Sequence, residues 1–469
     1  MLFDSPVYLL FLIFVVLLYW RLGFHAQNRF LLAASYFFYG WWDWRFLLLM
    51  ISSTIIDYLI AQRIAAAELP ARRRALLIAS LVLNFSILGF FKYCNFFLDS
   101  FDHATQMFGL KIPIGMLQII LPPGISFYTF QEVAYIVDVY KRKLRPSRSF
   151  VEYGLFISLF PHLIAGPIQR PSHLLPQVQQ PRRLDWNRIF DGLQLIVEGL
   201  FRKCVIADNC AIISNAAFSG QLGPPSIPVT LLAMYAFAWQ IYGDFSGYSS
   251  IARGSAQLLG FHFMVNFRQP YLAASLQDFW RRWHISLSSW LRDYLYIPLG
   301  GSRHGHFNTY KNLMLTMLLG GLWHGANWTF VVWGGIHGGG LAAERALQIE
   351  DGAAPGPALV RSWMRRIVVF HLVCIAWIFF RAPSIPAALN MLGGLGVWQW
   401  RAAYWVAFKF LALFSLPLML LDLQLEKTGD EYFLQSAGWT WRIAVASTAA
   451  IIAAFFGANQ SNAFIYFQF

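Results

Sequence analysis

The chain has 469 residues, of which 57% are hydrophobic and 13% charged, and its mean hydropathy is +0.49. So few polar residues could not cover the surface of a soluble protein of this length, which excludes a soluble enzyme, a secreted disulfide scaffold and a disordered chain. The net charge of +13 comes from basic residues in short loops between apolar segments. That is the positive-inside pattern of membrane proteins, and it argues against nucleic-acid binding.

Apolar stretches of membrane-spanning length recur along the first part of the chain. The first has no basic residues before it and no small-residue cleavage site after it, so we predict a retained span rather than a signal peptide. A mixed loop is expected after Lys92. Placing the basic clusters in the cytoplasm, among them Arg72–Arg74 and Lys141–Arg148, puts the N-terminus outside. The predicted spans cover 7–20, 30–44, 46–61, 75–91 and a segment that ends at Lys141.

The middle of the chain is less regular. Phe156–Pro167 is apolar but interrupted by proline, which predicts a re-entrant or broken helix shielded by protein. Segment 276–299 is amphipathic and predicts one helix, interfacial or buried between others. Roughly eleven spans of ~20 residues would account for half of the chain, so the sequence predicts an all-α polytopic membrane protein. The other predicted helices are 189–206, 228–248, 311–322, 327–347, 367–380, 404–422 and 440–457.

Polar residues inside a membrane are costly, so they are candidates for function. If segment 276–299 is one helix, Asp278 lies four residues before Arg282 and pairs with it. His284 then lies on a face with Trp280 and Leu287. The alternative is an interfacial helix with a tryptophan belt and snorkelling arginines, which leaves a histidine on the apolar face unexplained.

A second histidine lies among glycines in a long hydrophobic region. The glycines would let another backbone or a substrate approach His324, and Asn327 lies one turn away as a hydrogen-bond partner. The alternative is tight helix packing around a satisfied core histidine. His337 would point away from His324 on one straight helix. The glycines are Gly320, Gly321 and Gly325, and the bulky walls are Trp323 and Trp328.

The remaining polar candidates are weaker. Asp244, at the end of a span, could cap a helix, pair with an arginine or orient a catalytic histidine. His162, in the broken segment, is interpreted as structural. There is no Walker loop, dinucleotide fingerprint, HExxH, GxSxG or CxxC pattern, and no metal site is predicted. What remains is histidine-centred chemistry, in which imidazole acts as a general base near neutral pH.

The segments around His284, His324, Asp244 and His162 resemble those of the membrane-bound O-acyltransferases, most closely the bacterial branch that contains the alginate O-acetylase membrane component. The resemblance implies one domain over 1–469, a ring of tilted helices with re-entrant segments around a central tunnel, and a signature histidine that maps onto His324. The family's second polar position maps onto His284. Ser250 departs from the Asp expected in alginate acetylases, which weakens alginate as the substrate. The segments that carry the resemblance are Phe279–Ser288, Trp290–Tyr294, Gly321–Asn327, Pro123–Tyr128, Pro161–Pro167 and Asp244–Tyr248.

By this resemblance, the chain is expected to be a multi-pass acyltransferase of the bacterial inner membrane that moves acetyl groups from cytoplasmic acetyl-CoA to an exopolysaccharide. Its expected partners are a periplasmic SGNH-type acetyltransferase, the exopolysaccharide synthesis machinery and membrane lipids. No permanently bound cofactor is expected. His324 would be the general base or a transient acyl carrier, and His284 would position the thioester or stabilise charge. The supporting candidates are Asn327, Asp244 and Trp323, with Arg281 and Arg282 attracting the phosphates of coenzyme A.

Two alternatives stay open at this point. The same scaffold could carry D-alanine to teichoic acid, or acylate a lipid or a protein. A transporter or flippase without covalent chemistry is the other alternative. Transporters often contain inverted repeats, and the chain has no second copy of the His284 or His324 segment.

Overall fold

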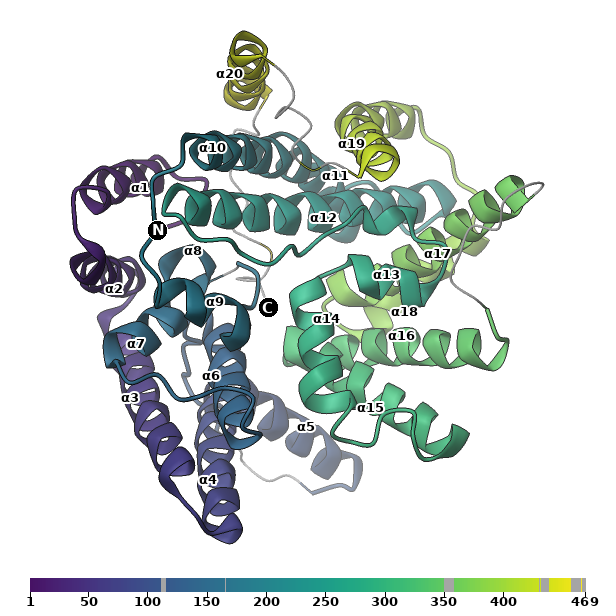
Figure 1. The fold of residues 1–469 in the computed structure, drawn as a ribbon. Coiled ribbons are helices and arrows are strands. Elements are labelled where there is room, and N and C mark those ends of the chain that lie inside the picture. The colour runs from purple at the N-terminus through teal and green to yellow at the C-terminus, as the bar shows by residue number, and fades with distance from the viewer. Residues whose placement is uncertain are drawn as a thin grey trace. The chain divides into compact units, whose positions relative to one another are not determined.

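Helices account for all regular structure in the part of the chain that the structure, a computed structural model, describes. This confirms the all-α prediction. The chain forms two compact units. Two of the boundaries between them fall inside α10 (Trp186–Leu200) and α12 (Ile227–Leu258), helices labelled in Figure 1, and the third follows Met264. Unit 1 comprises Met1–Leu193 and Ala252–Met264, and unit 2 comprises Gln194–Ile251 and Val265–Phe469. The described residues are 1–110, 115–164, 166–349, 358–429, 431, 438–456 and 465.

Unit 1 begins with four helices of the predicted kind. Proline at the first position of α1 and α4, and the Ser5 and Asp43 side chains that cap α1 and α3, explain where these helices start. The pair α3 and α4 packs as a hairpin against α6 (Figure 1). The helices are α1 (Pro6–Tyr19), α2 (Phe24–Gly40), α3 (Trp44–Ala66), α4 (Pro70–Leu88), α5 (Cys94–Met107), α6 (Ile125–Tyr140), α7 (Phe150–Ser158), α8 (Phe160–Leu163) and α9 (Pro171–Val178).

The expected loop after Lys92 is wrong. A π-helical turn, Gly89–Tyr93, joins α4 to α5 without a break, so helix continues to Met107. The polar residues of α5 look like a loop in the sequence because only part of the helix is apolar. Most of them are instead exposed or half-buried on a continuous helix, and Thr105 is buried.

The two main basic clusters lie at the same end of unit 1. Arg73, at the start of α4, donates to the backbone oxygen of Tyr140 at 2.7 Å. Gln62, near the end of α3, donates to the backbone oxygen of Ser147 at 2.6 Å. This arrangement supports the expectation that both clusters face the same side of the membrane.

The predicted broken segment is confirmed. Helix α7 ends at Ser158, α8 begins at Phe160, and the Ser35 hydroxyl accepts from the Phe160 backbone N–H at 3.1 Å. The segment Pro123–Tyr128 packs directly on this break. Gly124 has φ of 73°, and a Cβ there would lie 2.5 Å from the Leu163 carbonyl oxygen, so only glycine fits.

Among the buried carboxylates of unit 1, Asp57 and Glu132 are fully buried, and neither was identified from the sequence. Asp57, on α3, accepts from Ser80 at 2.5 Å and from Asn84 at 2.7 Å, both on α4. Glu132, on α6, accepts from two hydroxyls of α3, Ser53 at 3.1 Å and Thr54 at 3.0 Å. These bonds tie α3, α4 and α6 together, and they explain the tolerance of acidic groups in an apolar interior.

Unit 2 is built around α12 and the hairpin of α15 and α16. That hairpin is tight because a Cβ at Gly321 would lie 2.2 Å from the Phe330 oxygen, and one at Gly334 would lie 2.3 Å from the Met317 oxygen. The helices besides α12 are α11 (Asp208–Phe218), α13 (Leu276–Arg282), α14 (Ile285–Leu291), α15 (Gly305–His324), α16 (Trp328–Ala346), α17 (Ala358–Arg381), α18 (Ile385–Gly393), α19 (Ala402–Thr428) and α20 (Trp439–Phe456).

Four helices in the described residues are long and apolar enough to cross a membrane. They expose large apolar side chains that a water-soluble protein would bury, such as Leu48, Val82, Val368 and Leu413. The predicted ring of roughly eleven tilted helices with a tunnel is not established by these helices and stays a prediction. The four spans are Trp44–Ala66, Pro70–Met107, Val360–Arg381 and Ala402–Thr428.

Candidate active site

His284 lies at a break between two helices, and the prediction of one helix over 276–299 is wrong. Helix α13 ends at Arg282, α14 begins at Ile285, and His284 between them has φ of 43° and ψ of 52°. A non-glycine residue rarely adopts this left-handed conformation, which costs energy and persists only when the surroundings hold it. The expected face shared by His284, Trp280 and Leu287 therefore does not exist.

Asn266 holds this break in place. Its backbone oxygen accepts from the Ile285 N–H at 2.9 Å. Its side-chain oxygen accepts from the Ser286 N–H at 3.2 Å and from the Ser286 hydroxyl at 2.8 Å. Its amide nitrogen donates to the Ser249 hydroxyl at 3.3 Å. The start of α14 is thus organised by one buried amide from a distant part of the sequence.

The same amide sets the protonation of the His284 ring. A backbone N–H can only donate, so the Asn266 atom that Ser286 contacts is the oxygen, Oδ1. His284 Nδ1 lies 3.2 Å from this oxygen and therefore donates to it. The lone pair is left on Nε2. Burial lowers the pKa of His284 to about 3, so the ring is neutral at physiological pH.

His324 lies beside His284 at the end of α15. The two ring centroids are 6.3 Å apart, and His324 is 3% exposed. Three aromatic rings enclose His324, with centroids 5.2 Å away for Trp323, 5.0 Å for Trp333 and 5.3 Å for Phe380. The two predicted histidines therefore lie side by side within one buried aromatic enclosure, which we call the histidine pocket.

His337 does not point away from this region, as one straight helix would require. The chain turns between His324 and Trp328, so α16 runs back along α15. Trp333 packs against both His324 and His337, with its ring centroid 5.0 Å from that of His324 and 4.8 Å from that of His337. His337 is 1% exposed and belongs to the wall behind His324.

The supporting residues of this segment have mixed outcomes. Asn327 caps α16, since its side chain accepts from the Thr329 N–H at 3.0 Å and donates to the Pro383 oxygen at 3.2 Å. Its expected hydrogen bond to His324 is replaced by this capping role. Trp323 is buried against His324 as predicted, whereas Trp328 is 53% exposed and forms no wall of the pocket.

Asp244 pairs with a lysine rather than an arginine. Lys203 Nζ lies 3.0 Å from Asp244 and 2.8 Å from Asp208, and all three side chains are buried. The next residue, Phe245, packs edge-to-face on the His284 ring at 4.6 Å. Asp244 therefore anchors the part of α12 that contacts His284.

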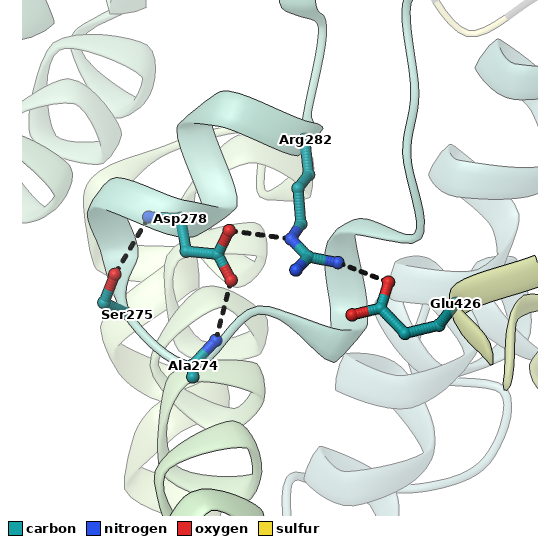
Figure 2. Close-up of polar contacts among 5 residues, drawn as sticks. All are labelled: Ala274, Ser275, Asp278, Arg282 and Glu426. Atoms are coloured by element: carbon teal, nitrogen blue, oxygen red, sulfur yellow. Dashed lines mark hydrogen bonds and ion pairs between the residues drawn. The ribbon is translucent and has the colours of Figure 1, made fainter. Parts of the chain in front are cut away.

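The arginines of α13 differ in their surroundings, as Figure 2 shows for one of them. The predicted pairing of Asp278 with Arg282 is confirmed at 2.7 Å, and Arg282 also binds Glu426 of α19 at 2.7 Å. Ser275 caps α13 at the Asp278 N–H. Two carboxylates thus neutralise Arg282, which favours a structural role for it. Arg281 is exposed and stays a candidate for binding phosphate.

Several residues of the pocket were missed by the sequence analysis. Asn266, Trp333 and Phe380 come from three separate segments, and none belongs to a pattern that distinguishes it from other buried amides or aromatic residues. Among the residues described, no group of three or more His, Cys, Asp or Glu side chains could hold a metal ion. The chemistry available here is that of two imidazoles in an apolar enclosure.

The chain is similar in sequence to named proteins, in several cases over most of its length. The model of the MBOAT, membrane-bound O-acyltransferase family, matches residues 7–349. "Probable alginate O-acetylase AlgI" of Pseudomonas aeruginosa is 44% identical over 404 residues, 85% of this chain and 76% of that protein. "Peptidoglycan O-acetyltransferase" of Helicobacter pylori is 37% identical over 84% of this chain and 80% of that protein. "Teichoic acid D-alanyltransferase" of Streptococcus thermophilus is 30% identical over 48% and 56%.

Proposed function

Because the chain belongs to the membrane-bound O-acyltransferase family and is a multi-pass membrane acyltransferase, we propose that it O-acetylates an exopolysaccharide. The donor is cytoplasmic acetyl-CoA, and the protein lies in the bacterial inner membrane. The relatives with the most extensive similarity include proteins named for O-acetylation of alginate and of peptidoglycan, which supports acetyl transfer to a polysaccharide. Membership of this family also argues against the transporter alternative.

The juxtaposition of His284 and His324 carries the proposal. In the reaction, His324 removes the proton from an acceptor hydroxyl, whose oxygen attacks the thioester carbonyl carbon. A C–O bond forms, the C–S bond breaks, and the departing thiolate receives a proton. His284, neutral and fixed in one tautomer by Asn266, positions the thioester or stabilises developing charge.

The aromatic enclosure favours a small acyl group. Trp323, Trp333 and Phe380 all lie within 5.3 Å of the His324 ring, measured between centroids. An acetyl group fits such an enclosure better than a long fatty acyl chain, which would need an apolar cavity leading to the histidine. This observation argues against lipid-type acylation on the same scaffold.

The acceptor is an alginate-like polymer, and a periplasmic SGNH-type acetyltransferase completes the transfer. Arg281 contributes to binding the phosphates of coenzyme A. Transfer of D-alanine is the second candidate, and it draws on similarity to a teichoic acid D-alanyltransferase over about half of the chain. The greater identity and coverage of the O-acetylating relatives favour acetyl transfer.

Competing donors distinguish these functions. Purified protein in nanodiscs would be given radiolabelled acetyl-CoA or a D-alanyl thioester of a carrier protein. The periplasmic SGNH-type acetyltransferase and a soluble uronic-acid oligosaccharide as final acceptor would be present in both reactions. The proposal predicts label transfer from acetyl-CoA that is lost in His324→Gln. Transfer from the D-alanyl carrier alone would refute acetyl-CoA as the donor.

A further inference from the structure

Unit 2 contains a cavity of about 350 Å³ that is separate from the histidine pocket. Its walls come from α12, α17, α19 and the 3-10 turn Pro270–Leu272. Most lining side chains are aromatic or aliphatic, and they include Tyr235, Tyr271, Phe408 and Met419. A volume of this size falls in the range of ~300–1,000 Å³ that is usual for small-molecule sites. The cavity is thus large enough for a substantial apolar ligand.

The lining includes one cation, Arg366, and one carboxylate, Asp422. Asp422 accepts a hydrogen bond from the Tyr242 hydroxyl at 3.1 Å and forms no ion pair with Arg366 in the described structure. Arg366 lies with its guanidinium carbon 4.9 Å from the centre of the Trp363 ring. Its Nε is buried and has no hydrogen-bond partner among the described residues, and no described carboxylate forms an ion pair with it. A partly buried cation without a counter-charge is costly, so an anionic group is expected to complete this site.

The surroundings of the cavity indicate what brings that anion. Helices α17 and α19 are two of the four candidate spans, and both turn large apolar side chains outward. Met364 is 61% exposed, Ile367 55% and Leu420 62%. The cavity therefore opens between surfaces suited to hydrocarbon, where a water-soluble anion would be excluded. Arg366 lies near the start of its span, at the depth where arginine reaches the headgroup region.

We propose that this cavity binds one anionic phospholipid, with the phosphate on Arg366 and an acyl chain along the aromatic wall. The chemistry of the site matches the two ends of the molecule, an arginine for the phosphate and an apolar trough for the chain. Trp363 lies beside the cation at the level where tryptophan meets headgroups.

Such a lipid would also support the candidate active site. Tyr271 lines the cavity and stacks on Trp283, with 6.2 Å between ring centroids and 27° between planes. Trp283 directly precedes His284 in the chain. Lipid in the cavity would fill the space behind this aromatic wall. Any effect on catalysis rests on the proposed function, whereas lipid binding does not.

The test is retention of lipid by the full-length protein, measured by native mass spectrometry. Three proteins are released from nanodiscs that contain equal amounts of phosphatidylglycerol and phosphatidylcholine: wild type, Arg366→Gln and Arg361→Gln. Arg361→Gln is the matched control, because Arg361 lies on the exposed surface of the same helix. Wild type and control should retain one phosphatidylglycerol, and Arg366→Gln should retain at least tenfold less. Equal retention by Arg366→Gln, or equal retention of both lipids by wild type, would overturn the proposal.

A second variant tests the trough without changing charge. Met419→Trp fills the cavity and should also abolish retention, while leaving Arg366 in place. Retention of lipid by Met419→Trp would show that the chain lies elsewhere and refute the site. Addition of inorganic phosphate should not displace the lipid, and displacement would instead identify a simple anion site. Because these readouts do not involve acyl transfer, their failure leaves the proposed function standing.

Discussion

Replacing Asn266 with alanine removes the acceptor that holds His284 and the start of α14. Three hydrogen bonds to its side-chain oxygen are lost, from His284 Nδ1, the Ser286 N–H and the Ser286 hydroxyl. Each intramolecular hydrogen bond contributes roughly 1 kcal/mol net, and a buried donor left without a partner costs ~1–3 kcal/mol. Asn266→Ala should therefore lower the free energy of unfolding by about 3 kcal/mol or more.

The matched control is Ser249→Ala. Ser249 accepts one hydrogen bond, at 3.3 Å, from the same Asn266 side chain, so its loss should cost only about 1 kcal/mol. Both variants would be unfolded by SDS titration in mixed micelles, and acetyl transfer would be measured on the folded fraction. Asn266→Ala should lose most activity even when folded, because the His284 tautomer is no longer set. If both variants had equal stability and wild-type activity, the role assigned to Asn266 would be refuted.

Three further predictions concern the pH response, the acyl pocket and the buried charge. The folded-state pKa of His284 is about 3, below its ordinary value. The unfolded state therefore gains a proton as pH falls below ~6.5, and the free energy of unfolding decreases. His284→Gln should remove up to about 1.4 kcal/mol per pH unit of that decrease between pH 6 and 4, and an unchanged pH dependence of unfolding would contradict this. Phe380→Ala should raise the ratio of butyryl to acetyl transfer by about tenfold or more, because it removes a ring that packs against His324. Competition between butyryl and acetyl thioesters measures this ratio, and an unchanged ratio would show that Phe380 does not limit acyl size. Lys203→Met should cost about 3–5 kcal/mol, since it leaves Asp208 and Asp244 buried without their cation, and a stability equal to wild type would disprove this pairing.

The helical character of the chain could be predicted because it follows from local composition. Apolar runs, proline and serine at helix starts and the spacing of Asp278 and Arg282 each act within one or two turns of helix. The loop expected after Lys92 failed for a related reason. A helix with a polar exposed face has a composition similar to that of a loop, and the sequence alone does not show which helices pack against its apolar face.

The site was predicted only in part, because its geometry depends on contacts between distant segments. His284 and His324 could be identified as histidines in apolar surroundings. The break at His284 could not, since the side chain that stabilises it, Asn266, lies outside the helix pattern. Phe380 comes from α17 and reaches His324 only through tertiary packing. Lys203 comes from another segment than Asp244, and only the fold brings the two side chains together.

The most direct test of the account is the acetyl content of the exported polymer in cells that produce His324→Gln, with membrane protein level measured in parallel. Glutamine keeps a similar volume and hydrogen-bonding capacity but cannot act as a base. His25→Ala is the matched control, because His25 lies exposed in the first turn of α2. Acetylation should fall by roughly 10²–10⁴-fold in His324→Gln at normal protein level, and stay unchanged in the control. Wild-type acetylation by His324→Gln at normal protein level would contradict the central role of this histidine.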